Sequence, residues 1–255
     1  MKIIVAMRQL ADLVEELEVN ANGDDIDRDF VKFVANEWDE AALEEALCIK
    51  DESGAEVCVV ALDEPEVDQS LFTALAKGAD RAVKLTGHDP QKWIRSPERA
   101  EKLAKWIAAE SPDLVLTGVQ AADDLDGQLA ALLAARLGYP HAAVVVSLNV
   151  GSTECEITQE LGGGFTAISK VTLPAVMGIQ AARQAPRYAP ISRIRNAMQT
   201  MSIEEVEQSG AEDQTLFQVN RLYPPESRTG ATMLDGSATE VANQIVELIK
   251  SKGLI

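Results

Sequence analysis

The sequence predicts an α/β fold: a doubly wound, mostly parallel sheet followed by an extended C-terminal arm that ends in a helix. Short apolar runs alternate with helix-like segments at the spacing expected of parallel strands joined by covering helices. The chain has 255 residues, of which 46% are hydrophobic and 25% charged, and this suits one large globular domain with an arm.

The strands are predicted from short apolar runs bounded by polar or turn residues. KIIVAM at 2–7 and EVCVVAL at 56–62 are almost entirely apolar, as strands covered on both faces are. Between them, residues 12–29 are acidic and rich in Asn and Gly, which predicts a loop or hairpin. Further strands are predicted over 82–85, 113–117 and 142–148, with two or three more in 155–179 around a turn at 162–164.

The helices are predicted from their start and stop residues. Asn36 can cap a helix over 37–53, which Gly54 ends. Ser96 is the predicted cap, and Pro97 the first residue, of a helix that runs to about residue 111. Two more helices are predicted over 67–77, before Gly78, and from the loop at Gly127 to residue 137.

The chain after residue 180 has the character of an arm. It is poor in long apolar runs. Four prolines interrupt it, namely Pro186, Pro190, Pro224 and Pro225. Ser237 and Glu240 form a capping box that predicts the start of the final helix. A helix reached through a long irregular segment is typical of an arm that packs on another subunit.

The net charge and the hydropathy exclude two classes of protein. The chain has 23 Lys and Arg against 41 Asp and Glu, a net charge of −18, whereas a free-standing nucleic-acid binder needs a basic surface to neutralise phosphates. No stretch is long and apolar enough to predict a span or stable insertion in a membrane. The N-terminus lacks the architecture of a signal peptide, so a cytoplasmic protein is expected.

The charge is distributed unevenly along the chain. Residues 1–68 hold 20 acids and 5 bases, whereas residues 161–203 contain no Asp or Glu. The bases in that acid-free segment are Lys170, Arg183, Arg187, Arg193 and Arg195. Two interpretations stay open: a positive face that relieves self-repulsion, or a docking surface for an acidic partner or a bound anion.

Cysteines, histidines and catalytic motifs point to no metal and no catalytic residue. Cys48, Cys58 and Cys155 form no CxxC pair, so we expect reduced, buried thiols. Two histidines, His88 and His141, are too few for a histidine-rich metal site. The sequence has no Walker A loop, no GxSxG, no HExxH and no GxGxxG after the first strand, so no hydrolase or kinase is predicted.

The segment GVQAADDLDGQLA, from Gly118 to Ala130, follows a predicted parallel strand and leads into a helix. Ligands of open α/β sheets bind beyond the carboxyl ends of the strands, and a helix N-terminus favours phosphate. Three acids in the loop, Asp123, Asp124 and Asp126, oppose phosphate unless they point to water or to a ribose. Nucleotide binding and a solvated capping loop therefore both remain open at this point.

Motifs spread over essentially the whole chain resemble the β subunit of electron transfer flavoprotein. They are IVAMRQ at the first strand, NEWDEAALEEALCIK (36–50), ALAKGADRAV (74–83), DLVLTGVQAADD (113–124), QELGGG with LPAV (173–176), and APRYAPISRI (185–194). The ending RTGATMLDGSATEVANQIVELI resembles the branch that serves dehydrogenases of small methylated amines.

The resemblance implies a Rossmann-like, adenine nucleotide α-hydrolase-like domain in an obligate heterodimer. An α subunit would carry the redox-active FAD, and this chain would bind a second, buried nucleotide. That nucleotide is a structural AMP in most of the family and a second FAD in electron-bifurcating members. The contacts carried over by position are Ala6, Asn36, Glu37, Trp38, Asp39, Leu62, Gly118, Val119, Gln120, Ala121, Ala122, Asp123, Gly127, Gln128 and Leu129.

The phosphate loop departs from the family pattern. Where bifurcating members usually read DGDTAQVGP, this chain reads DDLDGQLAA, so that Asp124 replaces Gly and Asp126 replaces Thr. Leu129 stands where AMP-type members often have Thr, which removes a hydroxyl contact, although Gln128 is kept. The extra acid at Asp124 opposes a diphosphate more than a monophosphate, and we therefore favour AMP over FAD.

The resemblance also divides the chain by role: a nucleotide-binding domain over 1–185, a partner recognition loop over 186–200, and an arm over 201–255 that packs on the α subunit. Ile191 stands at the position of a branched apolar anchor that inserts into a flavin-dependent dehydrogenase; a buried Ile in a local turn is the alternative. The recognition residues implied are Arg187, Tyr188, Ile191, Arg193, Ile194 and Arg195.

Leu13 and Glu160 are the implied contacts with the α subunit. The family's usual Arg before Glu160 is Gln159 here, which puts one ion pair at that boundary in doubt. The resemblance predicts an electron carrier subunit and not an enzyme. The competing class is a stand-alone nucleotide sensor of the universal-stress type, which needs neither a basic recognition segment nor an arm.

Overall fold

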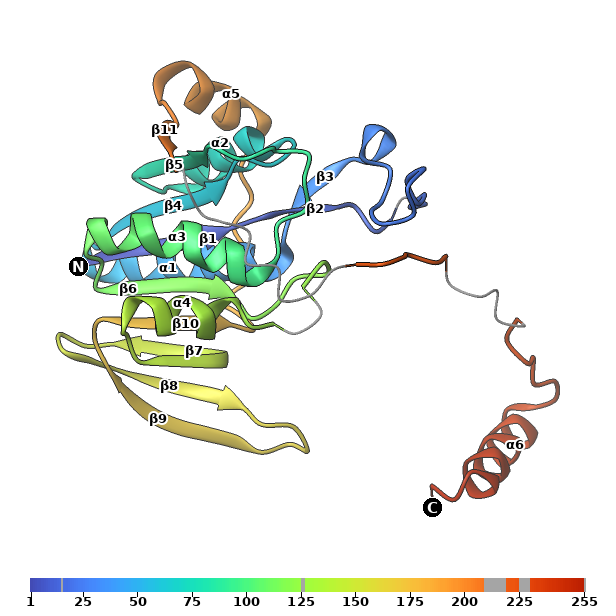
Figure 1. Ribbon diagram of the computed structural model, residues 1–255. Coiled ribbons are helices and arrows are strands. Elements are labelled where there is room, and N and C mark those ends of the chain that lie inside the picture. The colour runs from blue at the N-terminus through green and yellow to red at the C-terminus, as the bar shows by residue number, and fades with distance from the viewer. Residues whose placement is uncertain (15, 125–126, 209–218, 225–229, 255) are drawn as a thin grey trace. The chain divides into compact units, whose positions relative to one another are not determined.

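The computed structural model confirms the α/β fold with a mostly parallel sheet and a C-terminal helix (Figure 1). It describes residues 1–14, 16–124, 127–208, 219–224 and 230–254. The chain divides into two compact units, Met1–Leu222 and Tyr223–Ile255.

A nine-stranded sheet forms the centre of the first unit in the described part of the chain. Its strands are β1 (Lys2–Met7), β4 (Glu56–Leu62), β5 (Arg81–Thr86), β6 (Leu114–Gly118), β7 (His141–Val150), β8 (Glu154–Glu160), β9 (Thr166–Thr172), β10 (Ala175–Ile179) and β11 (Glu204–Glu207). Their order is β11-β5-β4-β1-β6-β10-β7-β8-β9, parallel from β11 to β7, with β8 and β9 antiparallel. A separate antiparallel pair joins β2 (Gln9–Ala11) to β3 (Phe33–Ala35).

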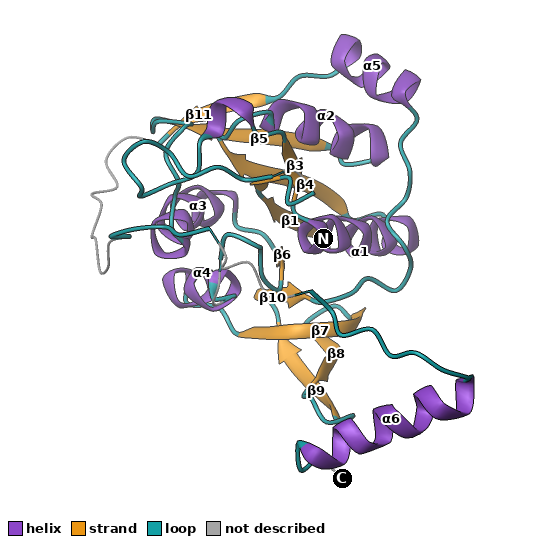
Figure 2. Cartoon of the chain, turned by 90° about the vertical axis from the view of Figure 1, so that its right-hand side faces the viewer, coloured by secondary structure: helices purple, strands orange, loops and turns teal. Residues whose placement is uncertain are grey.

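Helices cover both faces of this sheet. They are α1 (Glu37–Ser53), α2 (Val67–Lys77), α3 (Ser96–Glu110), α4 (Leu129–Leu137) and α5 (Ile191–Thr200), with a short 3-10 turn at Arg28–Phe30. Figure 2 shows α3 and α4 on one side of the strands and α1 with α2 on the other. The doubly wound arrangement predicted from the alternation of elements is therefore confirmed.

Burial on both faces explains why β1 is apolar throughout its length. Ile3 and Val5 pack into the core that α1 and α2 share with the sheet. The alternate residues Ile4 and Ala6 pack into a second core beneath α3 and α4. Because successive strand residues point to opposite faces, a strand covered on both sides needs apolar residues at every position.

The predicted starts and stops are largely confirmed, with one shift. Gly54 ends α1 in the left-handed conformation, at φ +69°. Arg95, not Ser96, occupies the N-cap position of α3 and makes no side-chain cap, so Ser96 is the first helical residue. The prediction of Ser96 as the cap is therefore wrong by one residue.

Residues 186–207 are more regular than the sequence predicts. The segment predicted as a loop over 186–200 contains helix α5, which packs against α2 through Ile194 and the buried Ala197. Residues 204–207 form β11 at the edge of the main sheet, although an arm was predicted from residue 201. The division between compact units falls instead after Leu222. The periodicity of the sequence does not predict these short elements, because packing of α5 on α2 and pairing of β11 with β5 stabilise them.

The second unit contains helix α6 (Ala238–Ser251), and its predicted capping box is confirmed. The Ser237 Oγ accepts from the Glu240 backbone N–H, while the Glu240 carboxylate accepts from the Ser237 N–H at 2.8 Å. None of the described side chains of α6 is buried within the unit, and Ile245, Val246 and Leu248 are exposed.

The thiol prediction is confirmed, because Cys48, Cys58 and Cys155 are free and buried. Burial raises the pKa of Cys58 to about 12, which leaves this thiol protonated and unreactive at neutral pH. The described residues contain no group of three or more His, Cys, Asp and Glu arranged to hold a metal ion. No described helix is long and apolar enough to cross a membrane.

Candidate functional site

The predicted nucleotide residues gather at the carboxyl edge of the sheet. Strands β4, β1 and β6 are neighbours, so Leu62, Ala6 and Gly118 lie at or near adjacent strand ends. Leu62, Ala6 and Leu129 all belong to the core on the α3 and α4 side. This is the edge at which open α/β sheets bind ligands.

Asp39 is the polar centre of this edge. Its Oδ1 accepts from the Gly118 N–H at 2.8 Å, and its Oδ2 accepts from the Arg8 N–H at 3.0 Å. The carboxylate therefore joins the start of α1 to the ends of both β1 and β6. Burial raises the pKa of Asp39 from 3.8 to about 6, against the opposing effects of Arg8 and of the backbone hydrogen bonds.

We expect Asp39 to make the protein more stable as the pH falls toward 5. Its pKa of about 6 in the folded state exceeds the 3.8 of an exposed Asp, so the folded state binds the proton more tightly between those values. Linkage then predicts a gain of about 1 kcal/mol between pH 7.5 and 5. Urea unfolding of wild type and Asp39→Asn at both pH values isolates this effect. Identical pH dependence in the two proteins contradicts it.

Asn36 occupies the N-cap position of α1, but its side chain does not cap the helix. Its backbone carbonyl accepts from the Glu40 N–H, whereas its Nδ2 donates to the Gln120 carbonyl at 2.9 Å. Its Oδ1 is buried without a hydrogen-bond partner in the described part of the chain. The predicted side-chain cap is therefore wrong: Asn36 instead ties α1 to the loop after β6.

Arg8 is a residue of this edge that the sequence prediction did not select. Its side chain is only 4% exposed, and it contacts Asp123 and Asp124, each at 3.2 Å. Asp124 in turn accepts from the Gly127 N–H at 3.1 Å. The acids that oppose phosphate in the sequence are thus partly neutralised by Arg8. The sequence feature that could have pointed to Arg8 is a cation directly after a buried parallel strand, within the IVAMRQ motif.

A second buried cation, Arg99, lies in the first turn of α3. It is 1% exposed and donates to Glu64 Oε1 at 2.5 Å, while Glu64 Oε2 accepts from the Gln9 N–H at 3.1 Å. The sequence signal was its place four residues before Leu103 on the apolar face of α3, where a charged residue is unusual.

The remaining predicted contacts differ in exposure. Gly118, Ala121 and Leu129 are buried, Trp38, Val119, Asp123 and Gly127 are half-buried, and Glu37, Gln120, Ala122 and Gln128 are exposed. Gln128 occupies the N-cap position of α4 but makes no side-chain cap. Asp126 lies outside the described residues. The buried polar groups at this edge therefore include backbone groups and Arg8, whereas Gln128 is exposed.

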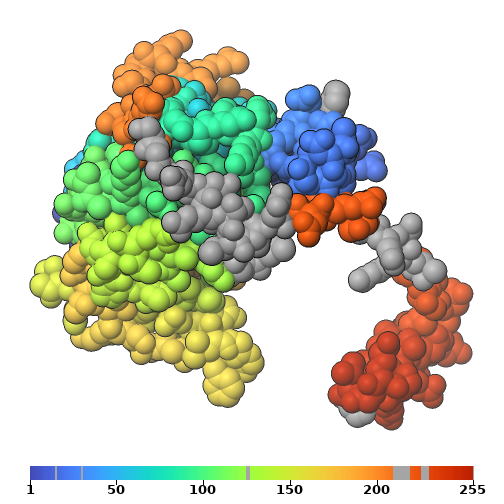
Figure 3. All heavy atoms as spheres, in the orientation of Figure 1, coloured from blue at the N-terminus to red at the C-terminus, as the bar shows by residue number. Residues whose placement is uncertain are grey.

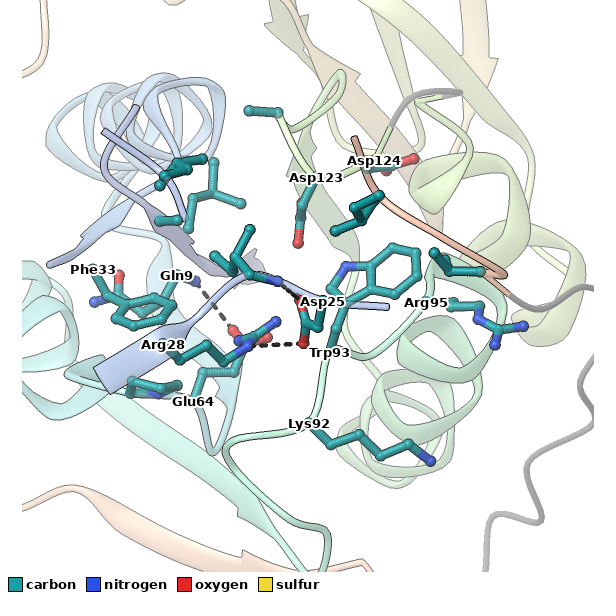
Figure 4. Close-up of a pocket in the computed structure, with 18 of the residues that line it drawn as sticks. Gln9, Asp25, Arg28, Phe33, Glu64, Lys92, Trp93, Arg95, Asp123 and Asp124 are labelled. Carbon is teal, nitrogen blue, oxygen red and sulfur yellow. Dashed lines mark hydrogen bonds and ion pairs between the residues drawn. The ribbon is translucent and has the colours of Figure 1, made fainter. Parts of the chain in front are cut away.

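A cavity of about 430 Å³ opens beside this edge (Figure 4). Of the predicted site residues, only Leu13, Ala122 and Asp123 line it. In Figure 4, Trp93 and Asp123 point into the same space. Its size lies within the range of small-molecule sites. Its other lining residues include Gln9, Leu10, Ile26, Arg28, Phe33, Glu64, Lys92, Arg95, Ser96, Pro97 and Asp124.

Part of the basic segment is used internally. Arg183 contacts Glu45 and Glu52, both at 2.7 Å. Arg187 contacts Glu44 at 2.9 Å and Asp51 at 3.0 Å. The pKa of Glu44 is lowered because hydrogen bonds from Arg187 and Gln184 outweigh the opposite effect of burial.

Arg187 therefore fastens the segment around residues 183–187 to α1, which is a structural role. Its part in partner recognition stays a prediction. Arg193 and Arg195 are exposed and form no ion pair with described residues. Ile191 is 64% exposed and Tyr188 is exposed too, whereas Ile194 packs partly into the core. The open surface of α5 is visible in orange at the top of Figure 3.

Comparison with known proteins decides the family. Residues 26–211 match the electron transfer flavoprotein domain. The chain is 38% identical to electron transfer flavoprotein subunit beta of Methylophilus methylotrophus, over 98% of each chain. It is 32% identical to the mitochondrial subunit beta of Arabidopsis thaliana, over 90% of this chain and 92% of the relative. The chain belongs to the electron transfer flavoprotein family.

Within the electron transfer flavoprotein family, both of these relatives are β subunits, and so is a relative from Syntrophomonas wolfei that is 33% identical over 77% of this chain and 76% of the relative. The protein is thus an electron transfer subunit. The predicted α-subunit contacts Leu13 and Glu160 are both exposed, Glu160 at the end of β8. Their role stays a prediction.

The site of this electron transfer flavoprotein subunit fits a bound phosphate-containing nucleotide. Three buried guanidinium donors, Arg8 Nε, Arg99 Nε and Arg99 Nη1, have no hydrogen-bond partner in the described residues. Gly127 adopts φ +59°, and a Cβ there would approach the Val119 carbonyl to 2.9 Å. Buried donors without a partner and a turn that a side chain would block are compatible with a phosphate group at this edge.

Proposed function

We propose that this protein is the β subunit of a heterodimeric electron transfer flavoprotein that holds a structural AMP. Electrons from a flavin-dependent dehydrogenase would enter through FAD carried mainly by the α subunit and leave to a downstream acceptor. The observation that supports the AMP is the set of unused buried guanidinium donors beside the phosphate loop. The ending of the sequence supports a dehydrogenase of small methylated amines as the donor.

In this proposal the AMP supplies no redox chemistry and stabilises the loop. Gly118, Gly127 and the backbone between them would surround the phosphate, with Arg8 as a nearby cation. Ala6 and Leu62 would border the base from the two strand ends. Asp39 and Asn36 would hold the start of α1 against the loop through their contacts with Gly118 and Gln120. The nucleotide would therefore tie β1, β4, β6 and α4 together.

Extraction of nucleotides from the purified heterodimer tests this function. We expect one FAD and one AMP for each dimer. Two FAD and no AMP would overturn the AMP assignment and support the alternative, an electron-bifurcating subunit in which the second FAD takes part in electron transfer. The crowding of Asp123 and Asp124 on Arg8 disfavours a diphosphate.

A stand-alone nucleotide sensor is the competing class, and colour separates the two. A carrier subunit expressed alone should be colourless and poorly behaved, and co-expression with an α subunit should give a yellow complex. A well-behaved, colourless monomer that binds nucleotide by itself would favour the sensor. We also propose a cytoplasmic location.

We expect Gly127→Val to lower the AMP content while FAD on the α subunit stays bound. A side chain at φ +59° is strained, and its Cβ would lie 2.9 Å from the Val119 carbonyl oxygen, so the loop must move. Nucleotide extraction from the purified dimer measures the effect.

Gly138→Val is the matched control for Gly127→Val. Gly138 ends α4, the helix that begins shortly after Gly127, and has φ +69°. A Cβ at Gly138 would meet no atom within 4 Å. The control carries the backbone strain without the contact with the phosphate loop. Equal AMP content in the two variants would remove Gly127 from the site.

A further inference from the structure

Two arginines that the family resemblance did not single out form a buried cationic pair beside the nucleotide site. Arg8 follows β1, and Arg99 lies in the first turn of α3. Their side chains are 4% and 2% exposed. Burying a guanidinium is costly unless its donors and its charge are compensated, so each buried donor is expected to have an acceptor.

Protein groups leave part of each guanidinium unused. Arg8 gives its two terminal nitrogens to Asp123 and Asp124, and Arg99 gives Nη2 to Glu64. Arg8 Nε, Arg99 Nε and Arg99 Nη1 are buried and make no hydrogen bond within the described part of the chain. Buried donors in folded proteins almost always have an acceptor, so these three indicate one that the described part of the chain does not supply.

The two arginines belong to one cluster. Arg99 interacts electrostatically with both Asp123 and Asp39, and Arg8 also interacts with these two carboxylates. Glu64 links the pair through the backbone, since it accepts from Arg99 and from the N–H of Gln9, the residue after Arg8. Glu64, Asp123 and Asp124 line the 430 Å³ cavity, so both arginines pair with carboxylates of its lining.

We propose that Arg8 and Arg99 together bind the phosphate of the nucleotide. This inference rests on the proposed function and names the residues that recognise the anionic part of its ligand. Asp123 is the carboxylate that yields, because its side chain is 29% exposed against 2% for Asp124. The phosphate then takes the place of Asp123 on Arg8 and accepts from the unused donors of Arg99, and Asp123 turns to solvent. Guanidinium groups suit this role because their planar donor forks match phosphate oxygens.

Comparing AMP with adenosine tests the proposal, because the two ligands differ only in the phosphate. The sample is the heterodimer, co-expressed with its α subunit and stripped of nucleotide, and isothermal titration calorimetry measures both affinities. Arg99→Met is made together with Glu64→Gln, so that no buried carboxylate loses its partner. Glu64→Gln alone is the control. Arg99→Lys, which keeps a cation beside Glu64, is a second variant that preserves the ion pair.

We expect the double variant to bind AMP about 10- to 100-fold more weakly than the control, the scale of a lost charged hydrogen bond, with adenosine affinity unchanged. Arg99→Lys should lose AMP affinity in the same direction. Equal weakening of AMP and adenosine would make Arg99 a structural residue and overturn the proposal, as would unchanged affinity for both. Wild type that binds neither ligand would overturn the nucleotide function itself.

Discussion

Gly118→Ala is expected to destabilise the protein by about 3 kcal/mol or more, because no room exists for its methyl group. A Cβ at this position would lie 2.6 Å from Asp39 Oδ1, 2.7 Å from Trp38 Cβ and 2.8 Å from the Asp39 nitrogen. Two of these atoms lie in or next to the α1 backbone and cannot rotate away. Relief requires the start of α1 to move off the end of β6, which breaks the Gly118 to Asp39 hydrogen bond.

Urea unfolding followed by circular dichroism measures this loss. Gly230→Ala is the control, since a Cβ at Gly230 would meet no atom within 4 Å and this residue does not need the left-handed conformation. The same displacement separates the two halves of the proposed site, so AMP should be lost from Gly118→Ala during purification. A stable variant with full AMP content would show that α1 and the loop are not held together as described.

Ile191→Ala is expected to weaken docking to the dehydrogenase by roughly 1–3 kcal/mol, the scale of burying a branched apolar side chain. Ile191 starts α5 and is 64% exposed, while Ile194 and Ala197 hold the helix on the core. The exposed residue is therefore available to a partner without a cost to the fold. A transient carrier suits such a small anchor, because it must also dissociate.

Steady-state electron transfer from the dehydrogenase, measured against carrier concentration, tests the anchor. The half-saturating concentration should rise about 5- to 100-fold, with the flavin spectrum and the α–β dimer intact. Gln199→Ala is the control, because Gln199 is also exposed on α5 and its replacement by Ala perturbs the helix to a similar extent. If Ile191→Ala leaves both the half-saturating concentration and the maximal rate unchanged, Ile191 is merely an exposed helix residue.

The arginines around Ile191 differ in their contacts. Arg193 and Arg195 lie exposed on α5 and keep their proposed role of speeding association with the dehydrogenase. Salt should screen this effect. Arg187 also fastens its own segment to Glu44, 143 residues away in the chain. An Arg187 variant would change stability before it changed docking, and it is not a clean test of the interface.

The positions of the main strands and helices of the sheet could be predicted from sequence because their signals are local. Apolar runs such as 2–7 and stop residues such as Gly54 act within a few residues of themselves. Helix α5 could not be predicted, since its core contacts are only Ile194 and Ala197 and their effect depends on α2. Strand β11 is highly acidic, and it forms because β5 offers a free edge.

By itself the sequence determined the alternating elements, the family and the strand edge at which the candidate site lies. The tertiary structure alone decided which charges meet there: Asp39 between two strand ends, Arg8 on Asp123 and Asp124, Arg187 on α1. The reason is physical. Backbone conformation responds to near neighbours in the chain, whereas ion pairing and desolvation depend on distance and burial in space, which a linear pattern does not contain.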